Sequence, residues 1–394
     1  MFNFIQTIVL VVVKNVFLIC LGFGLFVYVS CNKTNDDIQD PAWTTLQKKL
    51  NIPAQPYNYA SPYLPAFFNN QFVTILDNTP AENPITNWGA TLGRVLFYDK
   101  DLSLNSSISC ASCHIQKLGF TDSVRFSKGF QGRHTRRHSM SLTNARFYLS
   151  GRFFWDERAA TLEDQVLQPI QDPVEMGLSL DSLTLRLKQT SIYPILFRYA
   201  FGEEEITSEK TAKALAQFVR SIVSTQSKYD KGRIQVDDRE ADFPNFTAQE
   251  NLGKNIFMKN LKVNCFGCHN TDVFAMDHPR NNGLTVDNAD SGIFIHTQNP
   301  LDIGKFKAPS LKNVALRRHF MHDGRLHSLQ EVVDHYSEGI LPNPNLDGHL
   351  HSNHPFEPYR MNLSVEEKNA LIAFLHTLTD EVLIHDEKFS NPFR

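Results

Sequence analysis

The sequence has few cysteines for its length and almost no net charge. Six cysteines are spread over 394 residues, so the chain is not one of the small secreted domains that dense disulfides hold together. Lysine and arginine number 39 and aspartate and glutamate number 42, which gives a formal net charge of −3 without a dense basic block. Nucleic acid is therefore not an expected partner. The 42% of apolar residues excludes a disordered chain and suffices for about two to three globular units.

The sequence also lacks a long hydrophobic run. Val16–Val29 is apolar but shorter than the roughly 20 residues that cross a bilayer, and it suits a signal-peptide core. Next come the small residue Ser30, then Cys31 and a polar stretch. This order resembles a bacterial lipoprotein processing site. We expect residues 1–30 to be a signal peptide that takes Cys20 with it, and a lipid on Cys31 to hold the chain on the periplasmic side of a membrane. The alternative, an uncleaved N-terminal anchor, places the chain on the same side.

The alternation typical of half-buried strands is scarce, whereas helical patterns are frequent. Ser208–Tyr229 repeats its apolar residues with a period of about 3.6 and is expected to be one helix. Thr247 with Glu250, and Ser364 with Glu367, have the spacing of capping boxes that open helices. The sequence therefore predicts a mainly α-helical fold.

After residue 85 the chain repeats itself, which predicts an internal duplication. Four motifs recur in the same order: Leu92-Gly93 as Leu252-Gly253, Cys110-x-x-Cys113-His114 as Cys265-x-x-Cys268-His269, Ser141–Asn144 as Ser310–Asn313, and Asp156-Glu157-Arg158 as Asp323-Gly324-Arg325. We expect a lipidated tether and irregular wrap over 31–85, an N-terminal domain over 86–235 and a C-terminal domain over 236–394.

The two Cys-x-x-Cys-His motifs carry the strongest chemical signal. In one helical turn both cysteines lie on the same side, with the histidine beside the second. The thiols can then bond the two vinyl groups of one haem while the histidine ligates its iron, which is the pattern of c-type haem attachment. A zinc site made from both cysteine pairs is the alternative, but it does not require a histidine after each pair. We expect two covalently bound haem c groups, one held by Cys110, Cys113 and His114 and the other by Cys265, Cys268 and His269.

With Phe154-Trp155-Asp156 between these motifs and Met321–Arg325 after them, the sequence resembles the bacterial di-haem cytochrome c peroxidase family and its MauG-like branch. The resemblance covers roughly residues 85–380. It implies two class I cytochrome c-like helical domains packed around an inter-domain interface. Hydrogen peroxide would react at the N-terminal haem, and a small c-type cytochrome or other redox protein would supply electrons through the C-terminal haem. The resemblance is also compatible with a homodimer.

The resemblance also implies which side chains surround the peroxide. Glu175 matches the family's distal glutamate, which can take a proton from peroxide and return it to the leaving oxygen. Gln165 and Pro169 match the pocket that holds the peroxide, and Trp155 matches an aromatic relay between the haems. Without this context, Glu175 would be a solvated carboxylate and Trp155 a core residue. The family's distal histidine has no clear counterpart, and His134 is only a nearby candidate.

A calcium ion between the domains is a further implication. Asn144, with backbone carbonyls near Lys307 and Pro309, matches the family's calcium site, and calcium favours such oxygen ligands. An asparagine that caps a loop is the alternative. The sequence departs from the family nearby, since Glu157 replaces the usual glycine after Trp-Asp and His138 replaces a common asparagine.

Tyr336 stands where the sixth ligand of the C-terminal haem is expected. Ordinary family members have methionine there, whereas MauG has tyrosine. Phenolate is anionic and harder than a thioether, so it should favour oxidised iron and lower the reduction potential. Met321 and His335 are alternative ligands, and a packed aromatic is the remaining interpretation.

Three functions stay open at this point. The first is a peroxidase that reduces hydrogen peroxide to water, and the second is a MauG-like oxidase that uses peroxide to oxidise a protein or organic substrate. The third is an electron carrier without catalysis, which leaves Glu175 unexplained. His349, His351 and His354 lie in a polar segment of the sequence. One interpretation is a metal site, and the other is a surface loop without a ligand.

Overall fold

A computed structural model of the chain describes residues 41–259, 265–275, 278–352 and 357–394. The predicted signal peptide, Cys20 and Cys31 lie outside these residues. Residues 45–394 form one unit, and of the unit 1–44 only residues 41–44, at the start of α2 (Pro41–Lys49), are described. None of the helices in these ranges has both the length and the apolarity of a membrane span.

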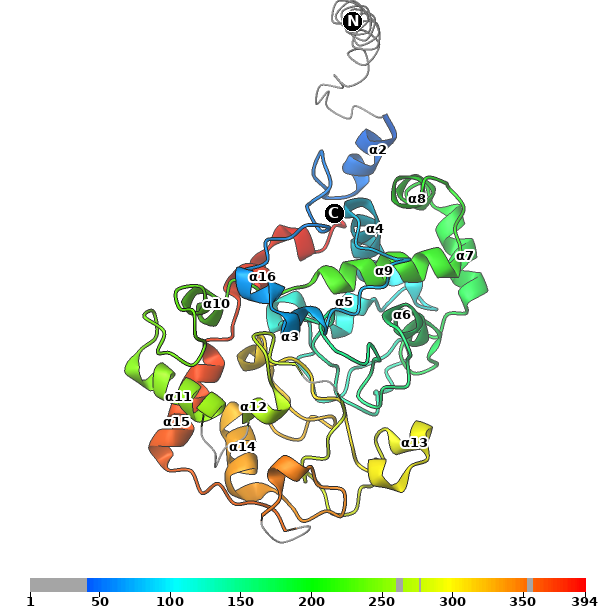
Figure 1. Cartoon of the computed structure of the whole chain (residues 1–394). Coiled ribbons are helices and arrows are strands. Elements are labelled where there is room, and N and C mark those ends of the chain that lie inside the picture. Colours follow the sequence, from blue (N-terminus) through cyan, green and yellow to red (C-terminus); the bar gives the residue numbers. More distant parts are fainter. Residues whose placement is uncertain (1–40, 260–264, 276–277, 353–356) are drawn as a thin grey trace, which may run out of the picture. The chain divides into compact units, whose positions relative to one another are not determined.

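The fold is mainly helical, as the sequence predicts (Figure 1). Within the described ranges there are isolated β-bridges but no strands. The helices after α2 are α3 (Gln71–Thr74), α4 (Asn87–Tyr98), α5 (Cys110–Cys113), α6 (Leu162–Gln171), α7 (Leu180–Gln189), α8 (Tyr193–Phe201), α9 (Ser208–Ser221), α10 (Lys228–Arg233), α11 (Ala248–Lys259), α12 (Cys265–Cys268), α13 (Phe294–Thr297), α14 (Leu329–Asp334), α15 (Val365–His376) and α16 (Glu381–His385). Short 3-10 helices connect them: η1 (Ala66–Asn69), η2 (Lys100–Leu102), η3 (Gln116–Leu118), η4 (Pro300–Asp302), η5 (Val314–Leu316), η7 (Gly348–Leu350) and η8 (Glu387–Phe389). A π-helical turn, η6 (His335–Gly339), continues α14.

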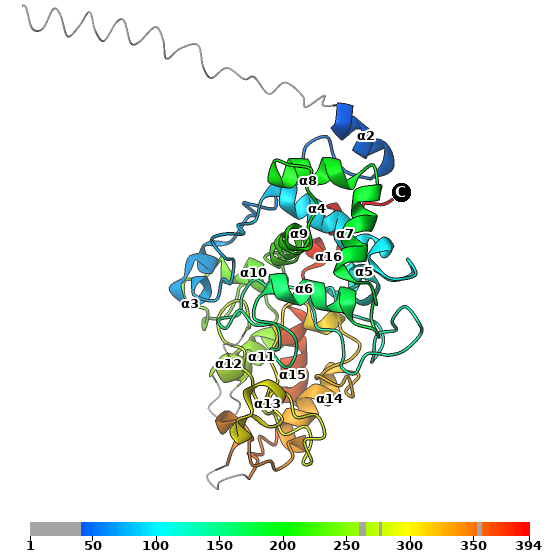
Figure 2. The same cartoon turned by 90° about the vertical axis from the view of Figure 1, so that its right-hand side faces the viewer.

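Each half is built around one pair of crossing helices. In the N-terminal half α4 packs against α9, and in the C-terminal half α11 packs against α15, as Figures 1 and 2 both show. A Cβ on Gly93 would lie 2.0 Å from the Ala214 carbonyl oxygen, and one on Gly253 would lie 1.9 Å from that of Ala370. The repeated Leu-Gly motif therefore has a packing reason, because each crossing is too close for a side chain. The internal duplication is visible in the fold.

The repeated asparagines also have equivalent roles. Asn144 and Asn313 both adopt left-handed backbone conformations, with φ of +61° and +60°, which asparagine tolerates better than most residues. Oδ1 of Asn144 accepts the N–H of Ser224 at 2.9 Å, and Oδ1 of Asn313 accepts the N–H of Asp380 at 2.7 Å. Each side chain thus fastens the segment that follows the second helix of a crossing pair.

The single helix expected over Ser208–Tyr229 is wrong, because α9 ends at Ser221 and α10 begins at Lys228. The backbone N–H groups of residues 224–226 bond to the side chains of Asn144 and Asp380 at 2.9 to 3.0 Å. These acceptors replace the carbonyls one helical turn earlier and stop the helix. They come from distant parts of the sequence, so the local period could not reveal the break.

Both expected capping boxes are confirmed. Glu250 N–H donates to Thr247 Oγ1 at 3.2 Å, and the Glu250 carboxylate accepts the N–H of Thr247 at 2.6 Å. Ser364 and Glu367 exchange the same two bonds at 3.2 and 2.8 Å. The boxes open α11 and α15, the two helices that cross in the C-terminal half.

A buried ion pair ties α10 to the C-terminal half. Lys312 Nζ lies 2.5 Å from Asp230 Oδ1, and both side chains are at most 1% exposed. Tyr229, next to Asp230 on α10, belongs to the hydrophobic core of the C-terminal half. The expected domain boundary near residue 235 stays a prediction. Helix α10 precedes this boundary in the sequence, but it packs against the C-terminal half.

Replacing Lys312 by methionine should lower the free energy of unfolding by about 3–5 kcal/mol, because it leaves the Asp230 carboxylate buried without its partner. Urea-induced unfolding of the purified protein measures the change. Lys305→Met is the matched control, since Lys305 is partly exposed beside Asp302 at 3.2 Å and should change stability by less than about 1 kcal/mol. Equal effects of the two substitutions would contradict the prediction.

Candidate functional site

The first Cys-x-x-Cys-His motif forms one helical turn, α5, with His114 just after it. Cys110 and Cys113 are both free, and burial raises the pKa of each thiol to about 12. Nδ1 of His114 lies 2.9 Å from the Phe120 carbonyl oxygen, which can only accept, so Nδ1 carries the proton. Nε2 is then the nitrogen available to ligate an iron, and the carbonyl fixes the ring's orientation.

The second motif forms α12 and lines a large apolar cavity. Burial lowers the pKa of His269 to about 4, and the Phe274 carbonyl opposes this shift. Nδ1 of His269 has no hydrogen bond of ordinary geometry to any described residue. The cavity is lined by Cys265, Cys268 and His269 together with apolar side chains that include Phe257, Leu329, Val333, Leu371 and Leu375.

Arg317 lines the same cavity and has no anionic partner among the described residues. Its Nη2 donates to the Ser310 carbonyl at 2.7 Å, but its Nε has no hydrogen-bond partner in the described ranges. Burial lowers the pKa of the guanidinium to about 10. A haem carries propionates that would meet this need. The cysteine pair, the histidine, the apolar walls and the buried guanidinium of Arg317 together fit a covalently bound haem.

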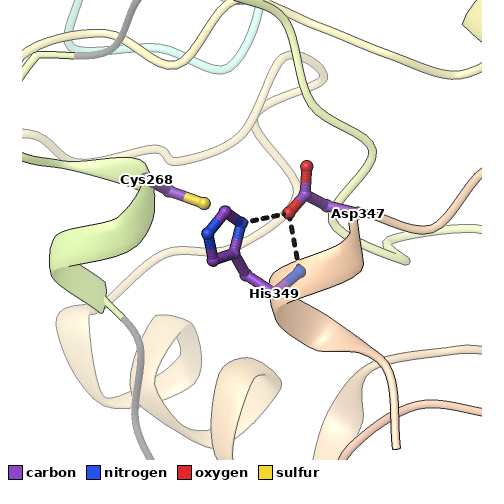
Figure 3. A group of neighbouring side chains, drawn as sticks. All are labelled: Cys268, Asp347 and His349. Carbon is purple, nitrogen blue, oxygen red and sulfur yellow. Dashed lines mark hydrogen bonds and ion pairs between the residues drawn. The ribbon is translucent and has the colours of Figure 1, made fainter. Parts of the chain in front are cut away.

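The zinc alternative is not supported. In the described part of the chain, the one group of three or more ligand-type side chains at metal-ligand spacing consists of Cys268, Asp347 and His349. Figure 3 shows that Asp347 accepts two bonds from His349, from Nδ1 at 2.8 Å and from the backbone N–H at 3.0 Å. The two cysteine pairs do not share a metal site. Because Cys268 is part of the haem motif, this group belongs to the candidate haem site.

Two of the three expected sixth ligands line the cavity. Nδ2 of Asn282 donates to Tyr336 Oη and to Met321 Sδ, each at 3.3 Å. Burial raises the pKa of Tyr336 to about 12, and the Asn282 hydrogen bond opposes the shift. Tyr336 lies on the π-helical turn η6, a feature frequent at functional sites. His335 does not line the cavity, and its Nε2 donates to the Asn282 carbonyl at 3.1 Å.

On the N-terminal side, Glu175 lies close to the first haem motif. Its carboxylate is partly buried and acts on the pKa of both Cys110 and Cys113. Burial raises the pKa of Glu175 to about 7, Asp172 adds to the shift and Arg158 opposes it. A carboxyl group with this pKa can exchange protons near neutral pH.

Gln165 and Pro169 are one helical turn apart on α6, so they share a face of the helix that precedes Glu175. Arg158 connects this helix to the Trp-Asp loop. Its Nε donates to Gln168 Oε1 at 3.3 Å, and its Nη1 lies 3.0 Å from Asp156 Oδ1. His134, the candidate distal ligand, is exposed, and its Nδ1 donates to the Phe126 carbonyl at 3.0 Å.

Trp155 lies at the seam between the halves and lines the C-terminal cavity. Its Nε1 donates to the His138 carbonyl at 2.7 Å, and its own carbonyl accepts the N–H of Lys307 at 2.9 Å. Burial lowers the pKa of the His138 imidazole to about 4, so it is neutral near pH 7. Trp155 is therefore held from both halves of the chain, through its indole by the N-terminal half and through its backbone by the C-terminal half.

The residues around Asn144 do not fit a calcium ion. Oδ1 of Asn144 is engaged by Ser224, and the side-chain atom without a partner in the described ranges is Nδ2, which is a donor. The Lys307 side chain is buried between the halves, where burial lowers its pKa to about 7 and Glu157 opposes the shift. Asn144 acts as a loop cap in this structure.

Four side chains with apparent roles were not identified from the sequence. Arg158 is part of a repeated motif, but repetition alone gave it no role. Asn282, Arg317 and the side chain of Lys307 act through contacts with residues far away in the chain, so no local pattern marks them.

Comparison with known proteins agrees with these features. A family model described as di-haem cytochrome c peroxidase matches residues 88–238. Methylamine utilization protein MauG of Methylorubrum extorquens is 36% identical over 304 residues, which cover 77% of this chain and 81% of that protein. Cytochrome c551 peroxidase of Nitrosomonas europaea is 29% identical over 296 residues, covering 74% of this chain and 80% of the relative.

The fold agrees as well. A crystal structure of a MauG-like protein associated with microbial copper homeostasis superposes with a TM-score of 0.70 and 33% identity. The match covers 86% of this chain and 100% of that one. The chain belongs to the di-haem cytochrome c peroxidase family, in its MauG-like branch.

Proposed function

We propose that this protein is a periplasmic di-haem peroxidase that reduces hydrogen peroxide to water at its N-terminal haem. The observation that carries the proposal is Glu175, a partly buried carboxyl with a pKa of about 7 beside the first haem motif. A haem held there by Cys110, Cys113 and His114 supplies the redox chemistry that splits the oxygen–oxygen bond. Glu175 takes a proton from the peroxide and returns it to the departing oxygen.

The other residues orient the reactants. The Phe120 carbonyl orients His114 as a proximal ligand, and Gln165 and Pro169 form the wall of the peroxide pocket. Trp155 relays electrons between the halves, because it lines the C-terminal cavity and is fastened to both. Because His134 is exposed and bonds to the Phe126 carbonyl, it would not ligate an iron held by His114, which would leave a position free for peroxide.

Steady-state oxidation of a reduced small c-type cytochrome by hydrogen peroxide tests the proposal. Turnover that requires both haems and is lost without peroxide is the expected result. If the protein contains two haems but reacts with peroxide neither before nor after reduction, the proposal is contradicted. An electron carrier without catalysis would then be the remaining function.

Trp155→Leu should lower the rate of cytochrome oxidation by about tenfold or more, since the aromatic relay at the seam is removed. Stopped-flow mixing of the reduced protein with peroxide should show that the first reaction at the N-terminal haem is unchanged. Trp88→Leu is the matched control, because Trp88 stacks on Tyr199 with ring centres 4.5 Å apart and does not line the cavity. Equal losses in both variants would indicate a packing role only.

A second candidate function is favoured by Tyr336. A phenolate in the C-terminal cavity would stabilise the oxidised state of that haem, so the protein could withdraw electrons from a protein or organic substrate, as MauG-type oxidases are expected to do. For the N-terminus we propose export and a lipid anchor at Cys31, which lies outside the described residues. Calcium is not part of the proposed function.

A further inference from the structure

Lys307 places a buried amine at the seam between the two halves. Its side chain is 8% exposed, and Nζ donates to the Arg152 carbonyl at 2.6 Å. Nζ also lies 3.5 Å from the centre of the Tyr148 ring and 4.6 Å from that of Phe153. Aromatic faces and carbonyl oxygens attract cations. All of these contacts come from the N-terminal half, while Lys307 belongs to the C-terminal half.

The same residue fastens the Trp155 loop through its backbone, since Lys307 N–H donates to the Trp155 carbonyl at 2.9 Å. Glu157 supplies the opposite charge. It is 9% exposed, its Oε1 accepts the Ser150 hydroxyl at 3.2 Å, and its charge acts on the Lys307 amine.

Glu157 is unusual because it adopts a left-handed backbone conformation, with φ of +55°. A side chain there costs roughly 1–2 kcal/mol relative to the ordinary helical region. A favourable interaction of the Glu157 carboxylate would offset this backbone strain. The negative charge of Glu157 raises the pKa of the buried Lys307 amine, so the carboxylate favours the ammonium form.

We propose that the Lys307 ammonium is the resident cation of this seam and that the protein binds no calcium there. Asn144 supports the proposal, because its Oδ1 is engaged by Ser224 and its unpartnered atom is a donor. Calcium needs several oxygen acceptors, and at this seam the Arg152 carbonyl already accepts a hydrogen bond from the Lys307 ammonium. Lys307 thus acts as a positioning residue that holds Trp155 between the halves.

The first test uses the wild-type di-haem protein and calcium itself. Calorimetric titration with calcium chloride up to about 1 mM, which reaches the weak extracellular sites, should show no binding, and EGTA should leave the unfolding temperature unchanged. Both measurements are made at about pH 6, which is below the pKa of about 7 of the Lys307 amine, so the amine is protonated. One calcium bound per chain, or a lower unfolding temperature in EGTA, would overturn the proposal.

The second test asks whether the site requires a cation. Lys307→Ala should lower the unfolding temperature, and methylammonium should restore at least half of the loss by occupying the vacated cage. Methanol, which is similar in size but uncharged, should restore none of it. Lys305→Ala removes the same charge from a partly exposed position and should not respond to methylammonium. Equal effects of methylammonium and methanol on Lys307→Ala would overturn the cation role. If Lys307→Ala does not fold, the calcium titration of the wild type still decides. Neither test depends on peroxide turnover.

Discussion

Replacing Glu175 by glutamine should lower kcat/KM for hydrogen peroxide by about 10²–10⁴-fold, the usual contribution of a positioned acid–base group. Glutamine keeps the size and the hydrogen-bonding shape of the side chain but cannot carry a proton between the two peroxide oxygens. The haem content and the unfolding temperature should stay at wild-type values. Steady-state peroxide assays, together with a haem stain on a denaturing gel, measure both.

The pH dependence gives the same prediction an independent readout. Burial and the neighbouring Asp172 raise the pKa of Glu175 to about 7, so the basic form is lost as the pH falls below that value. In the wild type kcat/KM should fall about tenfold per pH unit below pH 7 and level off above it. In Glu175→Gln this limb of the profile should disappear.

Two further substitutions separate Glu175 from general effects. Asp172→Asn keeps the acceptor that bonds Val174 N–H at 2.7 Å but removes the like charge, so the limb should move to lower pH. Asp164→Asn, at an exposed position on α6, should leave the profile unchanged. Turnover in Glu175→Gln that matches the wild type at every pH would rule out the acid–base role.

Features fixed by short-range geometry could be predicted from the sequence. Cys-x-x-Cys-His needs only one helical turn, and α5 and α12 provide it. The capping boxes before α11 and α15 span four residues each, and Gly93 and Gly253 mark the two helix crossings as members of a repeat. These local rules, with the resemblance to the family, gave the helical class and the duplication.

Features that depend on distant partners could not be predicted. The break after α9 is made by Asn144 and Asp380, which lie far away in the sequence on either side of it. Asn282 meets Tyr336 only because the fold brings a loop and the π-helical turn η6 to one cavity. The predicted calcium ligand, Asn144, was inferred from the resemblance to the family, but its oxygen accepts a hydrogen bond from Ser224. A sequence pattern identifies side chains that could ligate a metal ion, whereas the fold decides which of their atoms are already engaged in hydrogen bonds.

Replacing Tyr336 by methionine should raise the reduction potential of the C-terminal haem by on the order of 0.2 V, a part of the roughly 0.8 V over which axial ligands set haem potentials. Burial raises the pKa of the free phenol to about 12, so Tyr336 would lose its proton only on binding an oxidised iron held in this cavity. A phenolate ligand would be anionic and would favour the oxidised state, whereas a thioether is neutral and would favour the reduced state. Potentiometric titration followed by absorbance and EPR spectroscopy measures the change.

The functional consequence separates the two candidate activities. With methionine at position 336 the haem should accept electrons from a reduced cytochrome more readily and lose the ability to oxidise an organic or protein substrate. Tyr359→Met is the matched control, because Tyr359 packs on the same core but does not line the cavity, so the potential and the EPR spectrum should stay as in the wild type. Tyr336→Phe keeps the ring and removes only the oxygen, so it should change the EPR spectrum as well. If both substitutions at Tyr336 leave the potential and the spectrum unchanged, the tyrosine is a packed aromatic. Met321, which shares the Asn282 donor, is then the ligand to test.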